Sequence, residues 1–400
     1  MSKKAGIFVL VVSLILSILS TVVVKAGSGL RIIDSSAQAE FPTELSFNLK
    51  AESDVSVTDV RLHYIVEHEG YAQVTSEVYV ELVPALTIDV GWSWDMRRTG
   101  GLPPGSSLEY WWTVYDADGI QFKTTPVRVQ FDDNRYPWRS LSEGKVTIHW
   151  YDGGESFANE LMLTAQQAIS RLSEDTGARL EKPVVIYIYA DSRDLQGALI
   201  YPQEWTGGVT FQRYGTIAIG ISPEDITWGK RATVHELTHL VIHQATFNPY
   251  NDLPTWLDEG LAMYSEGALE APLRSLLNRA IAENELISVR GLSSPFSAFP
   301  EKSYLSYAQS YSLVEFLITN YGQARMLELL NIFRQGSTGD EALLKVYDFN
   351  MDGLDSLWRA YVAGRRQITE VSIAGVYMEL ALGGVGGASD GAPLSLRSGH

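Results

Sequence analysis

Hydrophobic and polar residues alternate along the first third of the chain, between about residues 30 and 132. In residues 60–67 every second side chain is apolar or aromatic, which is the period of a β-strand with one buried face: Val60, Leu62, Tyr64 and Val66. Two further runs, residues 108–117 and 120–131, flank Asp118-Gly119, a dipeptide that favours a tight hairpin turn. Strands repeated at this spacing predict an all-β sandwich domain over residues 30–133.

After residue 145 the pattern changes to a mixture of strands and helices. Residues 146–150 and 184–189 have the apolar composition of buried strands, and residues 155–174 between them have a helical period. Beyond residue 259 the pattern is helical, and we expect helices over residues 269–285, 303–320, 323–334, 340–347 and 353–366. The second domain is therefore predicted as an α+β fold over residues 145–366 with a helical C-terminal lobe.

Two segments carry no such period. Residues 134–144, with Pro137 among them, are predicted to link the two domains. Residues 383–400 are rich in Gly, Ala and Ser, and we predict a disordered tail there.

The first residues of the chain predict the cellular location of the protein. Lys3 and Lys4 precede an uncharged run over residues 5–24, and about twenty helical residues at 1.5 Å each cross a hydrocarbon layer of about 30 Å. The same segment, residues 1–26, also fits a signal peptide cleaved after Val24-Lys25-Ala26. A retained membrane anchor and a cleaved signal peptide both place the folded domains outside the cytoplasm.

Composition narrows the function classes. A 400-residue chain with 45% hydrophobic residues can bury two separate cores. Its net charge of −17 argues against nucleic acid as a partner, since binding to phosphates needs a basic surface. The chain contains no cysteine, which excludes disulfides, thiol catalysis and thiolate zinc ligands.

The strongest candidate chemistry lies in His235-Glu236-Leu237-Thr238-His239. Residues four apart share one face of a helix, so both imidazoles can bind one metal ion. A second helix after the breaker run 248–252 presents Glu259, with nineteen residues between it and His239. Two His and one carboxylate form the ligand set of catalytic zinc, and Glu236 is placed to take a proton from a water molecule held by the ion.

These motifs resemble those of the gluzincins, the thermolysin and aminopeptidase N group, and more closely the bacterial peptidase MA-like proteins, over residues 145–366. The resemblance implies an α+β metallopeptidase domain that cleaves peptides or proteins with Zn²⁺ as cofactor. It implies that Tyr307 donates a hydrogen bond to the oxyanion and that Glu266, seven residues after Glu259, fixes a ligand imidazole. Tyr304 and Tyr311 share a helical face with Tyr307, so helix geometry alone leaves the choice among the three open.

His243, Asp258 and residues 207–221 are further candidates near these motifs. His243 would be a third histidine ligand in a metzincin, but no glycine breaks the helix before it, and we expect a buried or interfacial histidine. Asp258 receives no catalytic role. The region that carries the Gly-x-Met-Glu-Asn segment in aminopeptidases here contains Gly207 to Gln212 and a predicted strand over residues 215–221, which could pair with an extended substrate or be an ordinary sheet edge.

Segment 110–115 resembles a core strand of immunoglobulin or fibronectin type III modules. The complete prediction is an N-terminal sandwich of this type, followed by a gluzincin-type metallopeptidase domain. We predict an extracytoplasmic zinc endopeptidase, because the amine-binding segment of aminopeptidases is missing. The alternatives are an aminopeptidase and a cell-surface binding protein whose peptidase lobe is vestigial. The oligomeric state cannot be predicted.

Overall fold

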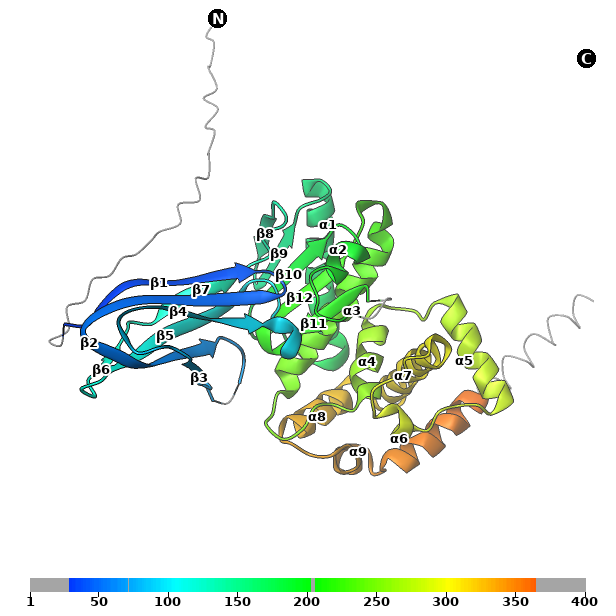
Figure 1. Cartoon of the computed structure of the whole chain (residues 1–400). Coiled ribbons are helices and arrows are strands. Elements are labelled where there is room, and N and C mark those ends of the chain that lie inside the picture. The colour runs from blue at the N-terminus through cyan, green and yellow to red at the C-terminus, as the bar shows by residue number, and fades with distance from the viewer. Residues whose placement is uncertain (1–28, 71, 203–205, 365–400) are drawn as a thin grey trace, which may run out of the picture. The chain divides into compact units, whose positions relative to one another are not determined.

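The computed structural model describes residues 29–70, 72–202 and 206–364 (Figure 1). The described residues form two compact units: residues 29–136 together with 196–202, and residues 137–195 together with 206–364. The predicted N-terminal segment, residues 1–26, and the predicted tail, residues 383–400, lie outside the described residues. Within the described part of the chain, no helix is both long and apolar enough to cross a membrane.

The first unit is built on one long strand that takes part in two halves of a sheet. Residues 44–52 of β2 pair with β1 and β4, and residues 57–66 pair with β3 and β5. Phe47 in the first half packs against Tyr110 on β5, with ring centroids 5.0 Å apart, so the two halves face each other across an apolar core. The predicted β-rich N-terminal region is confirmed, while its likeness to immunoglobulin or fibronectin type III modules stays a prediction. The strands are β1 (Arg31–Glu40), β2 (Glu44–Val66), β3 (Ser76–Val80), β4 (Ala85–Asp95), β5 (Ser106–Asp116), β6 (Gln121–Lys123) and β7 (Val127–Phe131).

The predicted hairpin around Asp118-Gly119 is present, but its second strand is interrupted. β6 and β7 both pair with β5, and the chain leaves the ladder between them at Thr124, whose hydroxyl accepts a hydrogen bond from the Trp112 N–H at 2.8 Å. Pro126 follows and has no N–H to donate to a ladder. A single strand over residues 120–131 is therefore wrong. Thr124 still donates its backbone N–H to the Trp112 carbonyl oxygen at 2.9 Å, but its hydroxyl replaces its carbonyl as the acceptor, and Pro126 has no N–H, so the pairing is interrupted.

The second unit contains a five-stranded sheet in the order β11-β12-β10-β9-β8. The predicted linker over residues 134–144 is wrong in its second half, because residues 139–143 form the strand β8 and pair with β9. The unit begins at Pro137, earlier than the predicted boundary at residue 145, and it excludes residues 196–202. The strands are β8 (Arg139–Glu143), β9 (Val146–Trp150), β10 (Val184–Tyr189), β11 (Gly208–Phe211) and β12 (Thr216–Gly220).

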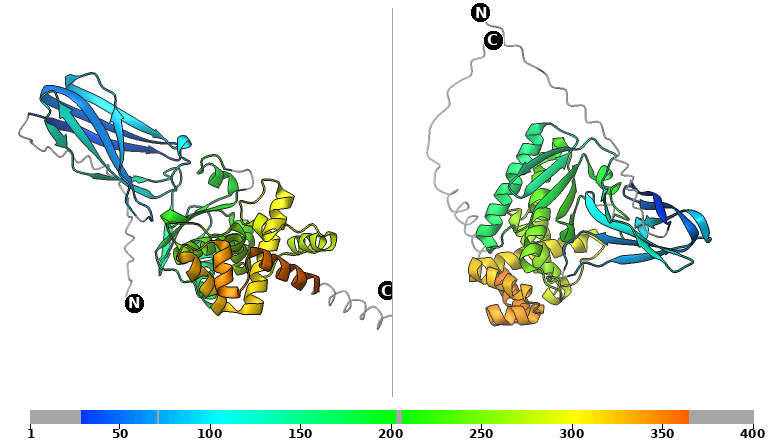
Figure 2. Two further views of the ribbon diagram at one scale, coloured as in Figure 1. Left: turned by 90° about the horizontal axis from the view of Figure 1, so that it is seen from below. Right: turned by 90° about the vertical axis from the view of Figure 1, so that its left-hand side faces the viewer.

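Helices cover one face of this sheet and continue into a helical lobe (Figure 2). The apolar side chains of β9, β10 and β12 share one buried core with those of α1 (Glu155–Thr176) and α3 (Ile226–Thr246). The core continues into α4 (Thr255–Ser265) and α7 (Pro300–Tyr321), which cross closely at Gly260. A Cβ at Gly260 would lie 2.5 Å from the Ser310 carbonyl oxygen, so only glycine permits this approach next to Glu259. The other helices are α2 (Ser192–Gln196), α5 (Ala271–Glu283), α6 (Val289–Leu292), α8 (Gln323–Arg334), α9 (Gly339–Tyr347) and a helix over residues 351–364.

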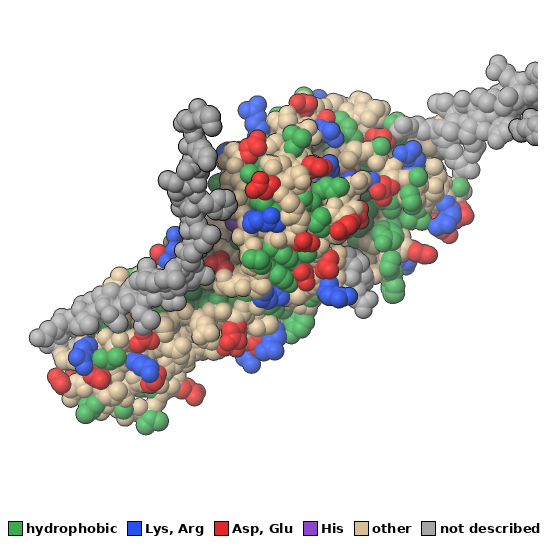
Figure 3. All heavy atoms as spheres, turned by 90° about the horizontal axis from the view of Figure 1, so that it is seen from above, with side chains coloured by type: hydrophobic (Ala, Val, Ile, Leu, Met, Phe, Trp, Pro, Cys, Tyr) green, Lys and Arg blue, Asp and Glu red, His purple; other side chains and the backbone are tan. Residues whose placement is uncertain are grey.

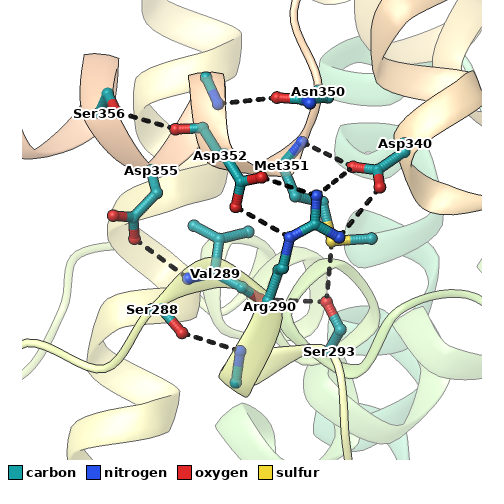
Figure 4. Close-up of polar contacts among 12 residues, drawn as sticks. Ser288, Val289, Arg290, Ser293, Asp340, Asn350, Met351, Asp352, Asp355 and Ser356 are labelled. Carbon is teal, nitrogen blue, oxygen red and sulfur yellow. Dashed lines mark hydrogen bonds and ion pairs between the residues drawn. The ribbon is translucent and has the colours of Figure 1, made fainter.

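Arg290 ties three helices of this lobe together (Figure 4). From α6, its guanidinium donates to both oxygens of Asp352 at 2.8 Å and to Asp340 on α9 at 2.9 and 3.2 Å. Asp340 also accepts the backbone N–H of Met351 at 2.9 Å. A bidentate arginine between two carboxylates fixes orientation as well as distance, so α6, α9 and the helix over residues 351–364 hold one arrangement around it.

Acidic, basic and apolar side chains are interspersed on the face of the molecule shown in Figure 3.

Candidate metal centre and active site

Helices α3 and α4 bring three potential metal ligands to one point. His235 and His239 lie one turn apart on α3, and Glu259 lies near the start of α4. Glu259 Oε2 is 3.4 Å from His235 Nε2 and 3.6 Å from His239 Nε2, and one ligand atom from each residue lies within 4.8 Å of the others. A zinc ion with bonds of about 2.0–2.2 Å fits among ligand atoms at these separations.

The charges and the unpaired oxygen of this cluster favour a bound cation. Glu259 Oε2 is buried and makes no hydrogen bond to the described residues, which is costly for a carboxylate oxygen. Burial by itself would lower the pKa of the His239 imidazole, but Asp258 and Glu259 outweigh burial and raise it to about 9. For His235, burial is likewise outweighed, by Glu259 and Glu266, and its pKa lies well above the usual range. An environment that favours positive charge this strongly suits a divalent ion.

Each imidazole is held on the side away from Glu259 by a further carboxylate. Glu266 Oε1 lies 2.7 Å from His235 Nδ1, the position that the family resemblance implies for it. Asp258 Oδ1 lies 3.1 Å from His239 Nδ1, at ion-pair distance but outside the geometry of a good hydrogen bond. Such partners fix the tautomer and leave the other ring nitrogen free to bind metal. The sequence predicts no catalytic role for Asp258, and in the structure its carboxylate lies beside His239 Nδ1.

Glu236 is held beside the cluster by strand β11. The Thr210 hydroxyl donates to Glu236 Oε2 at 2.7 Å and lies 3.0 Å from the Glu236 carbonyl oxygen. A Cβ at Gly208 would lie 2.7 Å from Glu236 Oε1, so the glycine leaves the space that this carboxylate occupies. The strand therefore fixes the direction of the predicted base. The sequence pattern does not predict this contact between β11 and α3.

The edge of the sheet nearest this carboxylate differs from the prediction. The strand expected over residues 215–221 is β12, which lies inside the sheet between β10 and β11. Its backbone groups are already paired on both sides, so it cannot add a substrate strand. The edge strand is β11, which runs antiparallel to β12.

Of the three candidate tyrosines on α7, which are Tyr304, Tyr307 and Tyr311, Tyr307 is the one at the metal cluster. Its ring centroid is 6.5 Å from that of His235, and Phe296 packs edge-on against it at 5.1 Å. Tyr304 is 53% exposed, and Tyr311 packs against Tyr264 at 6.0 Å. Burial, reinforced by the charges of Glu259 and Glu236, raises the pKa of Tyr307, so its hydroxyl stays protonated and able to donate at neutral pH.

His243 lies two turns beyond His235 on α3 and is not part of the metal cluster. It is half-buried, and its ring packs against Phe247 at 5.2 Å.

Residues 164–364, about half of the chain, match the family model of the Peptidase MA superfamily. The chain belongs to this superfamily. Membership and the His-His-Glu cluster together make the protein a zinc-dependent metallopeptidase. No curated protein matches its sequence.

Solved structures show distant likenesses. The M1 zinc metallopeptidase from Deinococcus radiodurans is 12% identical with a TM-score of 0.33, over 81% of this chain and 89% of that one. Aminopeptidase A of Legionella pneumophila, in complex with aspartic acid, is 11% identical with a TM-score of 0.40, over 84% of this chain and 50% of that one. Catalytically inactive OgpA from Akkermansia muciniphila, in complex with an O-glycopeptide substrate, is 10% identical with a TM-score of 0.21, over 29% of this chain and 32% of that one. This chain thus spans less than a third of OgpA.

Proposed function

We propose that this metallopeptidase is an endopeptidase that hydrolyses internal bonds of peptides or proteins outside the cytoplasm. The observation that carries the proposal is the surrounding of Glu236 on strand β11. On this strand Gly208 faces the Glu236 carboxylate, and the Thr210 hydroxyl donates a hydrogen bond to it. Residues 207–212 contain no carboxylate that would pair with the free amine of a substrate. A substrate peptide that continues past the site in both directions can therefore bind as well as one that ends there.

His235, His239 and Glu259 would hold the zinc ion, which when bound supplies a Lewis acid that polarises water and the scissile carbonyl. Glu236, oriented by Thr210, takes a proton from the attacking water and can pass it to the leaving amine. Tyr307 keeps its proton and donates a hydrogen bond to the oxygen that gains negative charge. Edge strand β11 offers unpaired backbone groups along which an extended substrate can lie.

Peptide pairs that differ only at their ends test this cleavage mode. We expect a peptide with an acetylated N-terminus to be cut at the same internal bonds, and at a comparable rate, as its free counterpart. The measurement is mass spectrometry of the products together with kcat/KM for each pair. Glu236→Gln, which keeps all three ligands, is the inactive control that excludes a contaminating protease. A strong preference for free N-termini or for aminoacyl chromogenic amides would instead establish an aminopeptidase, and zinc binding with no hydrolysis of any peptide would favour a binding protein.

The proposed location rests on the uncharged run after Lys3 and Lys4. A positive start followed by about twenty apolar or small residues is the pattern of an exported or anchored protein. The full chain is expected outside the cytoplasm or on the outer side of the membrane, accessible to protease added to intact cells. A chain that lacks residues 1–26 should stay inside and be protected. Equal distribution of both forms would reject this location.

A further inference from the structure

Arg231 on α3 grips the carboxylate that holds the first zinc ligand. Its Nε and Nη2 donate to Glu266 Oε2 at 3.1 and 2.7 Å, while Glu266 Oε1 lies 2.7 Å from His235 Nδ1. Its remaining arm, Nη1, donates to Glu270 at 2.5 Å. One guanidinium therefore connects α3 with Glu266 after α4 and with the N-cap residue of α5.

We propose that Arg231 is a positioning residue for zinc, which acts on His235 only through Glu266. The side chain of Glu266 is 10% exposed, so its charge has little water around it. Arg231 occupies one oxygen with two N–H groups, and this fixes the carboxylate so that its other oxygen points at His235 Nδ1. The planar fork supplies an orientation that a lysine ammonium cannot reproduce. His235 is thereby kept with its proton on Nδ1 and its lone pair on Nε2, facing Glu259.

A direct electrostatic effect of Arg231 would have the opposite sign. Arg231 is a cation close to a site for a dication, so removing its charge would by itself strengthen zinc binding. If positioning dominates, removing the side chain weakens zinc binding, because Glu266 is released from its orientation. The direction of the change therefore distinguishes the two effects without reference to peptide cleavage.

Zinc affinity of the full chain, measured by competition with a chromogenic chelator, tests the proposal. We expect Arg231→Met to raise the zinc Kd by about 10-fold, at the lower end of the 10–100-fold range for losing such a partner of a ligand. Arg231→Lys should recover only part of this loss. Glu270→Gln should change the Kd little, because the Glu270 carboxylate pairs with Arg231 and not with Glu266 or His235, and its side chain is half exposed. Tighter zinc binding by Arg231→Met would overturn the proposal.

The matched control is the neighbouring residue. Lys230 on the same helix pairs with Glu160 on α1 at 2.6 Å, and both side chains are substantially exposed. Lys230→Met removes the same charge one residue away and should leave the zinc Kd unchanged. A loss of affinity as large as that in Arg231→Met would mean that any cation lost from this helix weakens the site.

A double-mutant cycle separates positioning from general damage to the fold. In the Glu266→Gln background, Arg231→Met should cause little further loss of zinc affinity, since its route to His235 is already cut. The visible absorption spectrum of the cobalt-substituted protein adds a readout of ligand geometry, and it should change in Arg231→Met but not in Lys230→Met. Losses of equal size in both backgrounds would show that Arg231 does not act through Glu266.

Discussion

Two imidazoles and a carboxylate meet at the centre of this site, and each imidazole has a second carboxylate behind it. Glu266 and Asp258 stand 2.7 and 3.1 Å from the Nδ1 atoms of His235 and His239. The two histidine ligands could be predicted from the sequence, because the distance between two residues four apart is set by the helix itself. Glu259 could be predicted from the second helix that follows the breaker run 248–252. The contact between Asp258 and His239 could not, since it depends on how α4 is rotated against α3. Glu266 could be placed only by family resemblance, for the same reason.

At the residue scale, the hydroxyl of Tyr307 is expected to contribute strongly to kcat. We expect Tyr307→Phe to lower kcat by about 100-fold, the scale for losing one donor to a developing oxyanion, and to leave the zinc content unchanged. Steady-state kinetics and metal analysis on the purified variant provide the measurement.

The neighbouring tyrosines are matched controls for this prediction. Tyr304 is largely exposed and Tyr311 packs against Tyr264, so Tyr304→Phe and Tyr311→Phe should keep kcat near that of the unmodified protein. A loss confined to Tyr311→Phe would move the donor by one turn of α7. If no variant changed kcat, none of these three tyrosines would take part in the reaction.

At the scale of elements, the packing of strand β11 against helix α3 sets the position of the Glu236 carboxylate. Two glycines and a threonine from the segment 207–210 pass beside α3, and no side chain separates Gly208 from the Glu236 carboxylate. The sequence predicts a strand over residues 215–221 that could pair with a substrate or be an ordinary sheet edge, because hydrophobic runs identify strands but not their order in the sheet. β12 is apolar and buried because it lies inside the sheet. Strand β8 was predicted as part of a linker for a similar reason. It is an exposed edge strand, and its mostly polar residues lack the hydrophobic pattern that identifies a strand.

Gly208→Ala tests this contact between strand and helix. The new methyl group would meet Glu236 Oε1 at 2.7 Å and push the carboxylate off its hydrogen bond with Thr210. We expect kcat to fall by about 10–100-fold, since a misplacement of about 1 Å in a catalytic group has effects of this size. Zinc content should not change, because none of the three ligands is touched.

Gly154→Ala is the control for the added methyl group. Gly154 is the N-cap residue of α1, and the nearest atom to its added Cβ would be the Ser156 hydroxyl at 3.7 Å. This variant should retain full activity. Normal turnover in Gly208→Ala would show that the carboxylate has room to work from another position.

At the scale of the whole molecule, the chain divides differently from its linear pattern. The predicted domains are continuous, whereas residues 196–202 belong to the first unit although residues on both sides of them belong to the second. Arg135 gives one reason, since its guanidinium donates to the Gly197 carbonyl at 2.7 Å. A single arginine contact of this kind has no periodic signal in the sequence, so the excursion could not be predicted.

Zinc is expected to stabilise the second unit by an amount that grows with pH. A ligand at about 1,000 times its Kd adds about 4 kcal/mol, and a unit of this size gains about 2–4 °C in Tm for each kcal/mol, so the increment is on the order of 10 °C. In the metal-free protein, burial lowers the pKa of His239, but Asp258 and Glu259 raise it to about 9 from an ordinary value of 6.5.

A pKa that is raised by folding stabilises the metal-free fold fully below pH 6.5, and this contribution is lost as the pH rises toward 9. Zinc needs the neutral imidazole, so its binding releases protons and becomes tighter over the same interval. Calorimetry with chelator and with saturating zinc should therefore show the metal-free Tm falling and the zinc increment growing between pH 6.5 and 9. The transition of the first unit, which contains none of the ligands, serves as the internal control and should not respond to zinc. An increment that stayed constant between pH 6.5 and 9 would mean that His239 is already neutral in the metal-free protein over this interval.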